Sequence, residues 1–416
     1  MATNVLRTAS ANTYDNAIRN ITSRQSALSA LQENLTSGKQ VNRPSDDPTG
    51  AANAERALTR ISRVATDQRA LESQRNAIAM AESTLGDANA TLSQFRTLVV
   101  SAGNGVNSGA ERKTIAKELQ GLRDQLFSLA NQKDTNGLPL FGALNSALTP
   151  FVGPQATAPD YTFNGLPGQV ASNTVSIPFA LDGDSAFMHQ PARDGVYNVT
   201  VSSIPTSRTL TTDNVAVTSS SLVSGASYQI AITGVDTTTT PGTTVVTYDL
   251  TDTTTGTTTS QTAPGYASTQ TASIAVTGMA GLSLNINGTP AVGDTITVNP
   301  SASVFSVLDN AIKNISSAAN NNDATQAVSQ ALHNIDIGIE RVSAVRGQAG
   351  DLLNRADRIS SNQEARKVQL EADRSRAEDM DMISGISKFQ NQQTGFSAAL
   401  QSYAQVQKLS LFNFIS

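Results

Sequence analysis

The sequence contains no cysteine and no tryptophan. Without cysteine the chain has no disulfide framework, no thiolate metal site and no thiol nucleophile. Charged residues make up only 15% of the chain and the net charge is −5, so it lacks the basic field that holds nucleic acid. No apolar run approaches the length of a transmembrane helix, so we expect no membrane insertion. We therefore expect neither a nucleic acid nor a membrane as a partner.

The N-terminus also lacks the features of a cleavable secretory signal. The first twenty residues contain Arg7 and Arg19 as their basic residues but no continuous apolar core. We therefore expect either a cytoplasmic protein or one exported by a route that reads no such signal.

The middle of the chain, residues 143–303, lacks both lysine and glutamate, which are two good helix formers. It holds all but three of the 14 prolines, and its charges are nine aspartates against Arg193 and Arg208, a net of −7. This composition separates the middle from the two flanks and predicts a non-helical domain inserted between them.

The flanks carry apolar residues at the spacing of a coiled coil. Six apolar residues, the predicted rod seam, recur every seven positions without a break: Val64, Leu71, Ile78, Leu85, Leu92 and Val99. Residues 103–109 begin and end with glycine and interrupt this helix. A second heptad follows in the C-terminal flank, at Val328, Ile335, Val342, Ala349 and Ala356. A single stripe is typical of an ordinary core, but stripes of over four heptads in both flanks favour packing between long helices.

The two chain ends have narrow apolar stripes that neither end has enough mass to bury. Amphipathic helices of this kind must pair with each other or with neighbouring subunits. We predict a self-assembly interface formed by Ile21, Leu28, Leu31, Leu35, Leu400, Leu409, Leu411, Phe412 and Phe414.

The middle block alternates polar and β-branched residues between Gly, Pro and Asp turns. Strands are predicted at residues 195–202, 226–233, 243–251, 273–277 and 294–299, and the threonine-rich stretch 237–262 is predicted to be a solvent-exposed hairpin. The predicted fold class is therefore α+β: a long antiparallel coiled-coil rod formed by both chain ends, with an inserted all-β domain. The predicted domains are a terminal assembly domain (1–45 and 375–416), a helical rod (46–142 and 304–374) and the β domain (143–303).

No arrangement of residues points to catalysis, so we expect no enzyme, no cofactor and no metal. The chain has only two histidines, His189 and His333, and no HExxH motif. Gly183-Asp184-Ser185 lacks the flanking glycines of a nucleophile elbow. The pair Asp46-Asp47 precedes Pro48, which is the pattern of a helix N-cap with proline at the first helical position.

Three strings of sequence resemble the flagellin superfamily. They are LTSGKQVNRPSDDPTGAA at residues 35–52, GLRDQLFSLANQKDTNGLPLFGA at 121–143, and the C-terminal RAEDMDMISGISKFQNQQTGFSAALQSYAQVQKLSLFNFIS. They stand at the same positions relative to the chain ends as in the superfamily, and the resemblance covers most of both flanks.

Within the superfamily, the resemblance favours the branch that joins the flagellar hook to the filament. A junction-type loop resembles this branch; its residues are Asn42, Pro44, Ser45, Asp46, Asp47 and Pro48. Filament flagellins usually have an alanine-rich stretch after the paired aspartates, and they tend to end without the pair Phe412 and Phe414. Filament flagellin is the alternative, and a coiled-coil adhesin or a type III needle protein should lack the two-ended signature.

The resemblance implies unfolded export through the flagellar type III apparatus to an extracellular position at the hook–filament junction, without a cleaved signal peptide. The partners it implies are the chain itself, the other hook-associated junction protein, flagellin, and a cytoplasmic export chaperone at the C-terminal helix.

Overall fold

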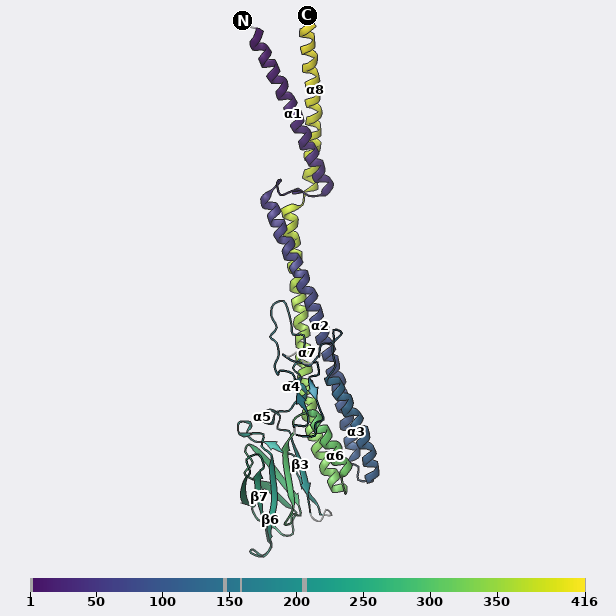
Figure 1. Ribbon diagram of the computed structural model, residues 1–416, viewed down its shortest axis with the longest axis vertical. Coiled ribbons are helices and arrows are strands. Elements are labelled where there is room, and N and C mark those ends of the chain that lie inside the picture. Colours follow the sequence, from purple (N-terminus) through teal and green to yellow (C-terminus); the bar gives the residue numbers. More distant parts are fainter. Residues whose placement is uncertain (1–2, 145–147, 158, 204–207, 416) are drawn as a thin grey trace. The chain divides into compact units, whose positions relative to one another are not determined.

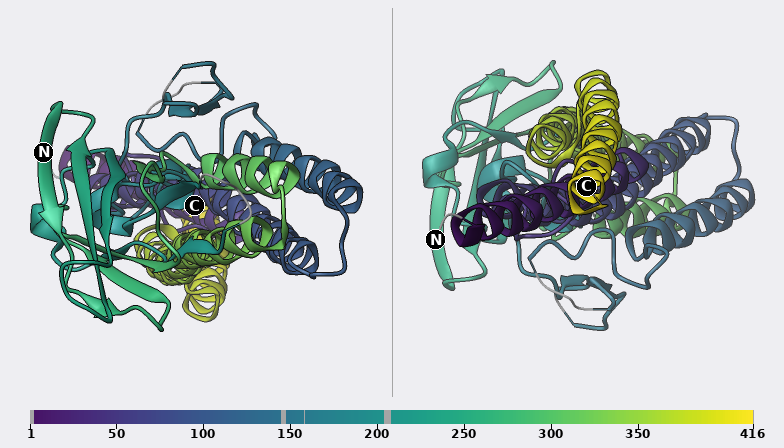
Figure 2. Two further views of the ribbon diagram at one scale, coloured as in Figure 1. Left: turned by 90° about the horizontal axis from the view of Figure 1, so that it is seen from below. Right: turned by 90° about the horizontal axis from the view of Figure 1, so that it is seen from above.

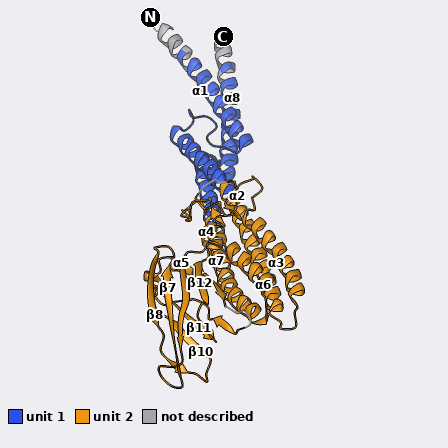
Figure 3. Cartoon of the chain, turned by 60° about the horizontal axis from the view of Figure 1, so that its bottom comes forward, with its two compact units in different colours: residues 1–69, 360–416 blue, residues 70–359 orange. Residues whose placement is uncertain are grey.

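A computed structural model describes residues 3–144, 148–157, 159–203 and 208–415. The chain divides into two compact units (Figures 1 and 3): unit 1 contains residues 1–69 and 360–416, and unit 2 contains residues 70–359. Two long helices, α2 (Pro48–Ala102) and α7 (Asn321–Glu378), contribute residues to both units. The three-part division expected from the sequence has other boundaries and stays a prediction.

Unit 1 brings the two ends of the chain together. Helix α1 (Thr3–Ser37) packs along helix α8 (Met382–Ile415). The rings of Tyr14 and Tyr403 lie 5.3 Å apart between their centroids, and Gln407 Nε2 donates a 2.8 Å hydrogen bond to the Tyr14 hydroxyl. The first turns of α2 and the last turns of α7 complete the unit.

The helical part of unit 2 combines the rest of α2 and α7 with α3 (Gly109–Ala130) and α6 (Val304–Ser317). The predicted break after α2 is confirmed, because α2 ends at Ala102 and α3 begins at Gly109. Ser108 caps α3 in a capping box: its hydroxyl accepts from the Glu111 amide at 3.3 Å, and its own amide donates to Glu111 Oε2 at 2.6 Å.

Polar pairs between α2 and α7 fix the direction of these two helices. Arg75 pairs with Asp357 at 3.0 Å, Asn89 with Ser343 at 2.7 Å, and Arg96 with Asp336 at 2.7 Å. Residue numbers rise along α2 while they fall along α7, so the helices are antiparallel, as predicted.

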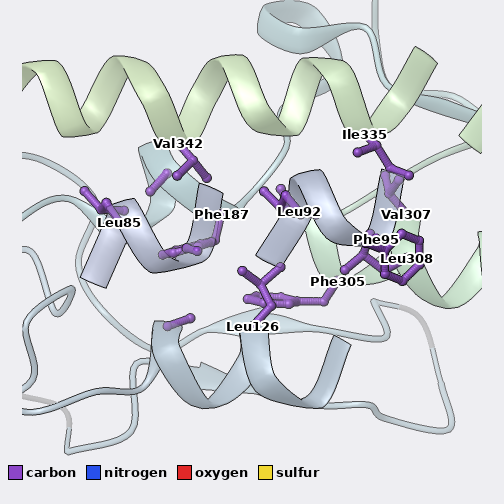
Figure 4. Close-up of a cluster of buried hydrophobic side chains, with 14 of the residues drawn as sticks. Leu85, Leu92, Phe95, Leu126, Phe187, Phe305, Val307, Leu308, Ile335 and Val342 are labelled. Atoms are coloured by element: carbon purple, nitrogen blue, oxygen red, sulfur yellow. The ribbon is translucent and has the colours of Figure 1, made fainter. Parts of the chain in front are cut away.

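Apolar side chains of all four helices form one core in unit 2. Figure 4 shows Leu85, Leu92 and Phe95 of α2 with Leu126 of α3, Phe305, Val307 and Leu308 of α6, and Ile335 and Val342 of α7. The two C-terminal heptad residues in this view face the α2 stripe, which is why both stripes persist over so many turns.

The segment between residues 140 and 196 packs against the helices. It contains two short strands, β1 (Phe151–Val152) and β2 (Thr162–Phe163), and two short helices, α4 (Gly183–Phe187) and α5 (Pro191–Asp194). Phe151, Tyr161 and Phe187 are buried in the helical core, where each ring contacts Phe305 of α6. The sequence analysis placed this segment in the β domain, because missing lysine and glutamate indicate only that a segment is not helical.

The β domain proper begins at Tyr197. One sheet has the order β3-β12-β6-β7-β8, with β9 beside β7; the other has the order β10-β11-β4, with β5 beside β11. The strands are β3 (Tyr197–Ser202), β4 (Leu210–Thr212), β5 (Ala216–Val217), β6 (Tyr228–Asp236), β7 (Thr243–Asp252), β8 (Thr257–Thr262), β9 (Tyr266–Ala267), β10 (Ala272–Val276), β11 (Leu282–Gly288) and β12 (Thr295–Pro300). A 3₁₀ turn, η1 (Ser220–Leu222), lies between β5 and β6.

Both sheets bury one face in a shared core that is separate from the helical core. The views in Figure 2 place these strands and the β1–β2 hairpin on different sides of the helices of unit 2. The threonine-rich stretch forms the hairpin β7–β8: β8 is largely exposed, whereas Val246, Tyr248 and Leu250 of β7 are buried in the domain core. The predicted α+β class, with an all-β domain inserted between long antiparallel helices, is therefore confirmed.

Candidate assembly surface

The junction-type loop lies in the connector between α1 and α2 in unit 1, and the first residues of that connector, Gly38 to Val41, pair with the end of α7 and the short connector to α8. The Met380 amide donates to the Gly38 carbonyl at 2.9 Å, and the Gln40 amide donates to the Glu378 carbonyl at 2.8 Å. Lys39 Nζ lies 2.5 Å from Glu378 Oε1. These bonds hold the two connectors side by side and antiparallel, so the break between α1 and α2 lies beside the break between α7 and α8 within this unit.

The paired aspartates organise the loop. Asp46 Oδ2 accepts from the backbone amides of Asn42 and Arg43 at 3.2 and 2.8 Å, which closes a tight turn containing Pro44 and Ser45. Pro44 and Ser45 themselves are exposed at this turn. The loop therefore has a defined shape that presents the side chains of Pro44 and Ser45 to solvent.

Asp47 caps helix α2, as the sequence predicted. Its Oδ1 accepts from the Thr49 amide at 2.9 Å and the Thr49 hydroxyl at 2.7 Å, with Pro48 at the first helical position. The bond from the Gly50 amide, followed by those from Thr49, holds the pKa of the Asp47 carboxyl below its usual value. This carboxylate stays ionised at neutral pH and satisfies amides that the helix itself leaves free.

Gly50 is required by a close approach within the same unit. A Cβ atom at this position would lie 2.9 Å from the Ala377 carbonyl oxygen of α7 and 2.7 Å from Asp47 Oδ2. Asn42 and Arg43 tie the loop to α1 through Asn34 at 2.7 Å and Glu33 at 3.0 Å. The loop is therefore held from α1, α2 and α7 together.

The predicted self-assembly residues of the terminal helices are only partly covered. Ile21, Leu28, Leu31 and Leu35 of α1 are half-buried, and Leu400 of α8 is 44% exposed. The side chains of Leu409, Leu411, Phe412 and Phe414 lie outside the described part of the structure. Ile383, at the start of α8, is 84% exposed and stands beside the partly exposed Met382 and Ile386. The predicted interface omitted this cluster, although its apolar residues at i and i+3 were a readable signal.

The predicted rod seam lies inside the helices of a single chain. Val64 is buried in unit 1, and Leu71, Ile78, Leu85, Leu92 and Val99 are buried in the core of unit 2. These residues are occupied by intramolecular packing, so they act on assembly only through the folded state of the helices.

No metal-binding group of three or more ligand-type side chains occurs in the described ranges. His189 is buried in unit 2, with Nδ1 3.6 Å from Asp194 Oδ2, and His333 is half-buried. Within the same described ranges, no helix combines the length and the apolar character needed to cross a membrane.

The protein is built from long antiparallel helices of both chain ends, with paired connectors and an inserted β domain. Its class is therefore that of helical proteins whose N- and C-terminal regions pack together. The family model for the bacterial flagellin N-terminal helical region matches residues 9–146, and that for the C-terminal helical region matches residues 332–415. The chain belongs to the flagellin family.

Individual relatives show the same likeness. Flagellar hook-associated protein 3 of Salmonella typhimurium is 34% identical over 141 residues, which cover 33% of this chain and 44% of that protein. A flagellin of Clostridium tyrobutyricum is 30% identical over 122 residues, covering 29% of this chain and 32% of the relative. Each of these two matches therefore spans less than half of this chain and less than half of the relative.

A solved structure extends the likeness in fold. The crystal structure of flagellar hook-associated protein-3 from Legionella pneumophila aligns with 76% of this chain and 97% of its own, with a TM-score of 0.60 and 23% identity. This likeness supports a shared fold of the helices and the inserted domain.

Proposed function

We propose that this chain is a structural adaptor that joins the flagellar hook to the flagellin filament. The observation that carries the proposal is the two-ended flagellin signature combined with the junction-type loop, Asn42 to Pro48, at the paired connectors. The Salmonella relative named as a hook-associated protein supports the same role. Filament flagellin is the second candidate, since a flagellin of Clostridium tyrobutyricum is also similar to this chain.

Assembly would use the terminal helices of unit 1. Two helices side by side cannot enclose their own apolar stripes, and the exposed Ile383 and Leu400 show what remains uncovered in one copy. We infer that neighbouring copies, the other hook-associated junction protein and flagellin cover this surface. An adaptor between two lattices needs two distinct surfaces, since a head-to-tail contact with identical partners propagates without end.

Export would precede assembly. The absence of cysteine suits a chain that crosses the envelope unfolded, and the apolar C-terminal residues need a cover before they reach their lattice. We propose export through the flagellar type III apparatus, with a cytoplasmic chaperone on the C-terminal helix. The working position of the protein would be extracellular, at the hook–filament junction.

Deletion of the gene tests the adaptor role. We expect cells that build hooks but release flagellin monomers into the medium, as seen by electron microscopy and by immunoblots of the medium. Antibody labelling of purified flagella should mark the junction alone. Normal filaments in the deletion strain would overturn the proposal, and label along the whole filament with loss of its main protein band would identify flagellin instead.

Truncation tests the assembly surface. A chain without residues 1–40 and 375–416 should remain helical by circular dichroism and monomeric by light scattering, because the apolar stripes are gone while the core of unit 2 is kept. An unfolded product, or one that polymerises as well as the full chain, would contradict the proposed surface.

A further inference from the structure

Four amide side chains on helix α7 line up toward the β domain within unit 2. Asn322, Gln326, Gln330 and Asn334 are spaced by four residues, which places them on one face of the helix. Gln330 and Asn334 are buried, and Asn322 and Gln326 are half-buried. We call these four residues the amide row.

The amide row bonds mostly to the backbone at the outer edge of two strands. Asn322 Nδ2 donates to the Leu210 carbonyl at 3.3 Å, and Gln326 Oε1 accepts from the Thr212 amide at 3.1 Å. Gln326 Nε2 also donates to the Thr212 hydroxyl at 2.8 Å. The Tyr197 carbonyl accepts from Gln330 Nε2 at 3.4 Å and Asn334 Nδ2 at 3.0 Å.

These backbone groups belong to the terminal strands of the two sheets. In the described part of the chain, β4 ends the smaller sheet and pairs with β11 alone, and β3 ends the larger sheet and pairs with β12 alone. Four residues of helix rise about 6 Å and two residues of strand span about 6.7 Å, so a step from Asn322 to Gln326 matches a step from Leu210 to Thr212. The helix thus takes the place of one more strand.

The contact between the helix and the β domain is polar. The helical core and the β-domain core are separate clusters, and a cavity of about 160 Å³ lies between α6, α7 and strands β3 and β4, lined by Val199, Leu210, Gln326 and Gln330 among others. In the described structure Gln330 Oε1 is buried without a hydrogen-bond partner. A polar contact of this kind resembles an interface between domains that separate without unfolding.

We propose that the amide row is a reversible contact with two roles. It holds the β domain on α7, and it prevents the edges of β3 and β4 from pairing with a second copy of this chain. Unpaired strand edges are ready-made templates for strand addition, and a helix that covers an edge removes this template. When the hydrogen bonds of the amide row break, the β domain moves as a folded unit on its two connecting segments near Val196 and Ser301. The edges of β3 and β4 then become accessible. This goes beyond the proposed adaptor role and stands independently of it.

Hydrogen exchange on the full-length chain tests the proposal. In a triple variant, Gln326→Ala, Gln330→Ala and Asn334→Ala, the Thr212 amide should exchange about tenfold faster or more, while the amides of β6 and β12 stay protected. The triple variant should also form dimers by light scattering at concentrations where the wild type is monomeric. Exchange and monomeric state should be unchanged in a control with Gln348→Ala and Asn354→Ala, which are exposed positions on the same helix.

A conservative variant separates the hydrogen bond from general damage. Gln326→Glu keeps an acceptor for the Thr212 amide, so this amide should stay more protected than in Gln326→Ala. Unchanged Thr212 exchange in the triple variant would overturn the proposal, as would loss of protection throughout the β sheets. A triple variant that releases the domain but stays monomeric at all concentrations would overturn the second role, the prevention of pairing.

Discussion

The hydroxyl of Tyr161 donates a 2.6 Å hydrogen bond to Asp309 Oδ2 on helix α6, 148 residues further along the chain. Arg123 of α3 donates to the same hydroxyl at 2.8 Å, and its Nε lies 3.3 Å from Asp309 Oδ1. Tyr161 is 1% exposed, and burial, followed by the neighbouring Asp309, raises its pKa above the ordinary value. The phenol therefore remains a donor at neutral pH and ties the segment after α3 to two helices.

Tyr161→Phe should destabilise unit 2 while leaving its shape intact. The ring keeps its place against Phe127 and Phe305, but the Asp309 carboxylate loses a bond that is typically worth about 1.5–3 kcal/mol when one partner is charged. The midpoint of urea unfolding by circular dichroism should fall, whereas the exposed change Gln348→Ala should leave it unchanged. An unaltered midpoint in Tyr161→Phe would show that the bond contributes nothing.

Removal of the β domain should be tolerated only within narrow limits. Val196 and Ser301 are joined by a 2.9 Å backbone hydrogen bond, so a short Gly-Ser linker can replace residues 198–299 without moving either end. We expect this chain to keep the thermal stability of the helices.

A wider deletion, of residues 147–302, should lower the thermal stability of the helices. It removes Phe151, Tyr161 and Phe187, and truncation of a buried aromatic side chain costs about 3–5 kcal/mol in each case. The two chains are compared by thermal melting and by secretion into the medium. Equal stability would mean that the segment after residue 140 is dispensable for the helical core.

A charge in the rod seam should abolish assembly through misfolding. Ile78 is fully buried, and Ile78→Asp would place a carboxylate among apolar side chains with no compensating partner. We expect hooks without filaments and flagellin in the medium in cells that carry this variant. Cells that carry Thr258→Asp, a change on the exposed strand β8, should swim normally on soft agar. Full motility of the Ile78→Asp strain would show that assembly does not require an apolar residue at this position of the rod seam.

Acid should weaken unit 2 through His189. Burial is the main cause that lowers the pKa of His189; Asp194 at 3.6 Å opposes it, and the nearby Arg193 and Arg341 add to it. A histidine with a lowered pKa binds its proton more tightly in the unfolded chain. Its contribution to stability is therefore complete above its ordinary pKa of 6.5 and is lost as the pH falls below that value.

The free energy of unfolding is measured between pH 8 and pH 5, and His189→Gln should flatten its decline. Burial also lowers the pKa of the half-buried His333, so His333→Gln should remove a smaller share of the decline. An identical pH dependence in wild type and His189→Gln would contradict this assignment.

Several elements follow from local sequence. Asp47 and Pro48 specify the start of α2, and the stretch from Gly103 to Gly109 specifies its break, because caps and breakers act on their immediate neighbours. Five of the strands lie where alternation predicts them, and the heptad residues are buried, since a period of seven selects one face of a helix whatever covers it. The family likeness was also readable, because its motifs are short and lie at the two ends of the chain.

Only the tertiary structure decided what covers each face. Phe151, Tyr161 and Phe187 stand in a segment rich in proline and glycine, and nothing near them indicates that their partners are Phe305 and Asp309. Asn322, Gln326, Gln330 and Asn334 look like an ordinary polar face of a helix, and they become a cover for two strand edges only once β3 and β4 lie beside them. Local patterns determine which groups need a partner, whereas the partner is chosen by contacts between residues far apart in the chain.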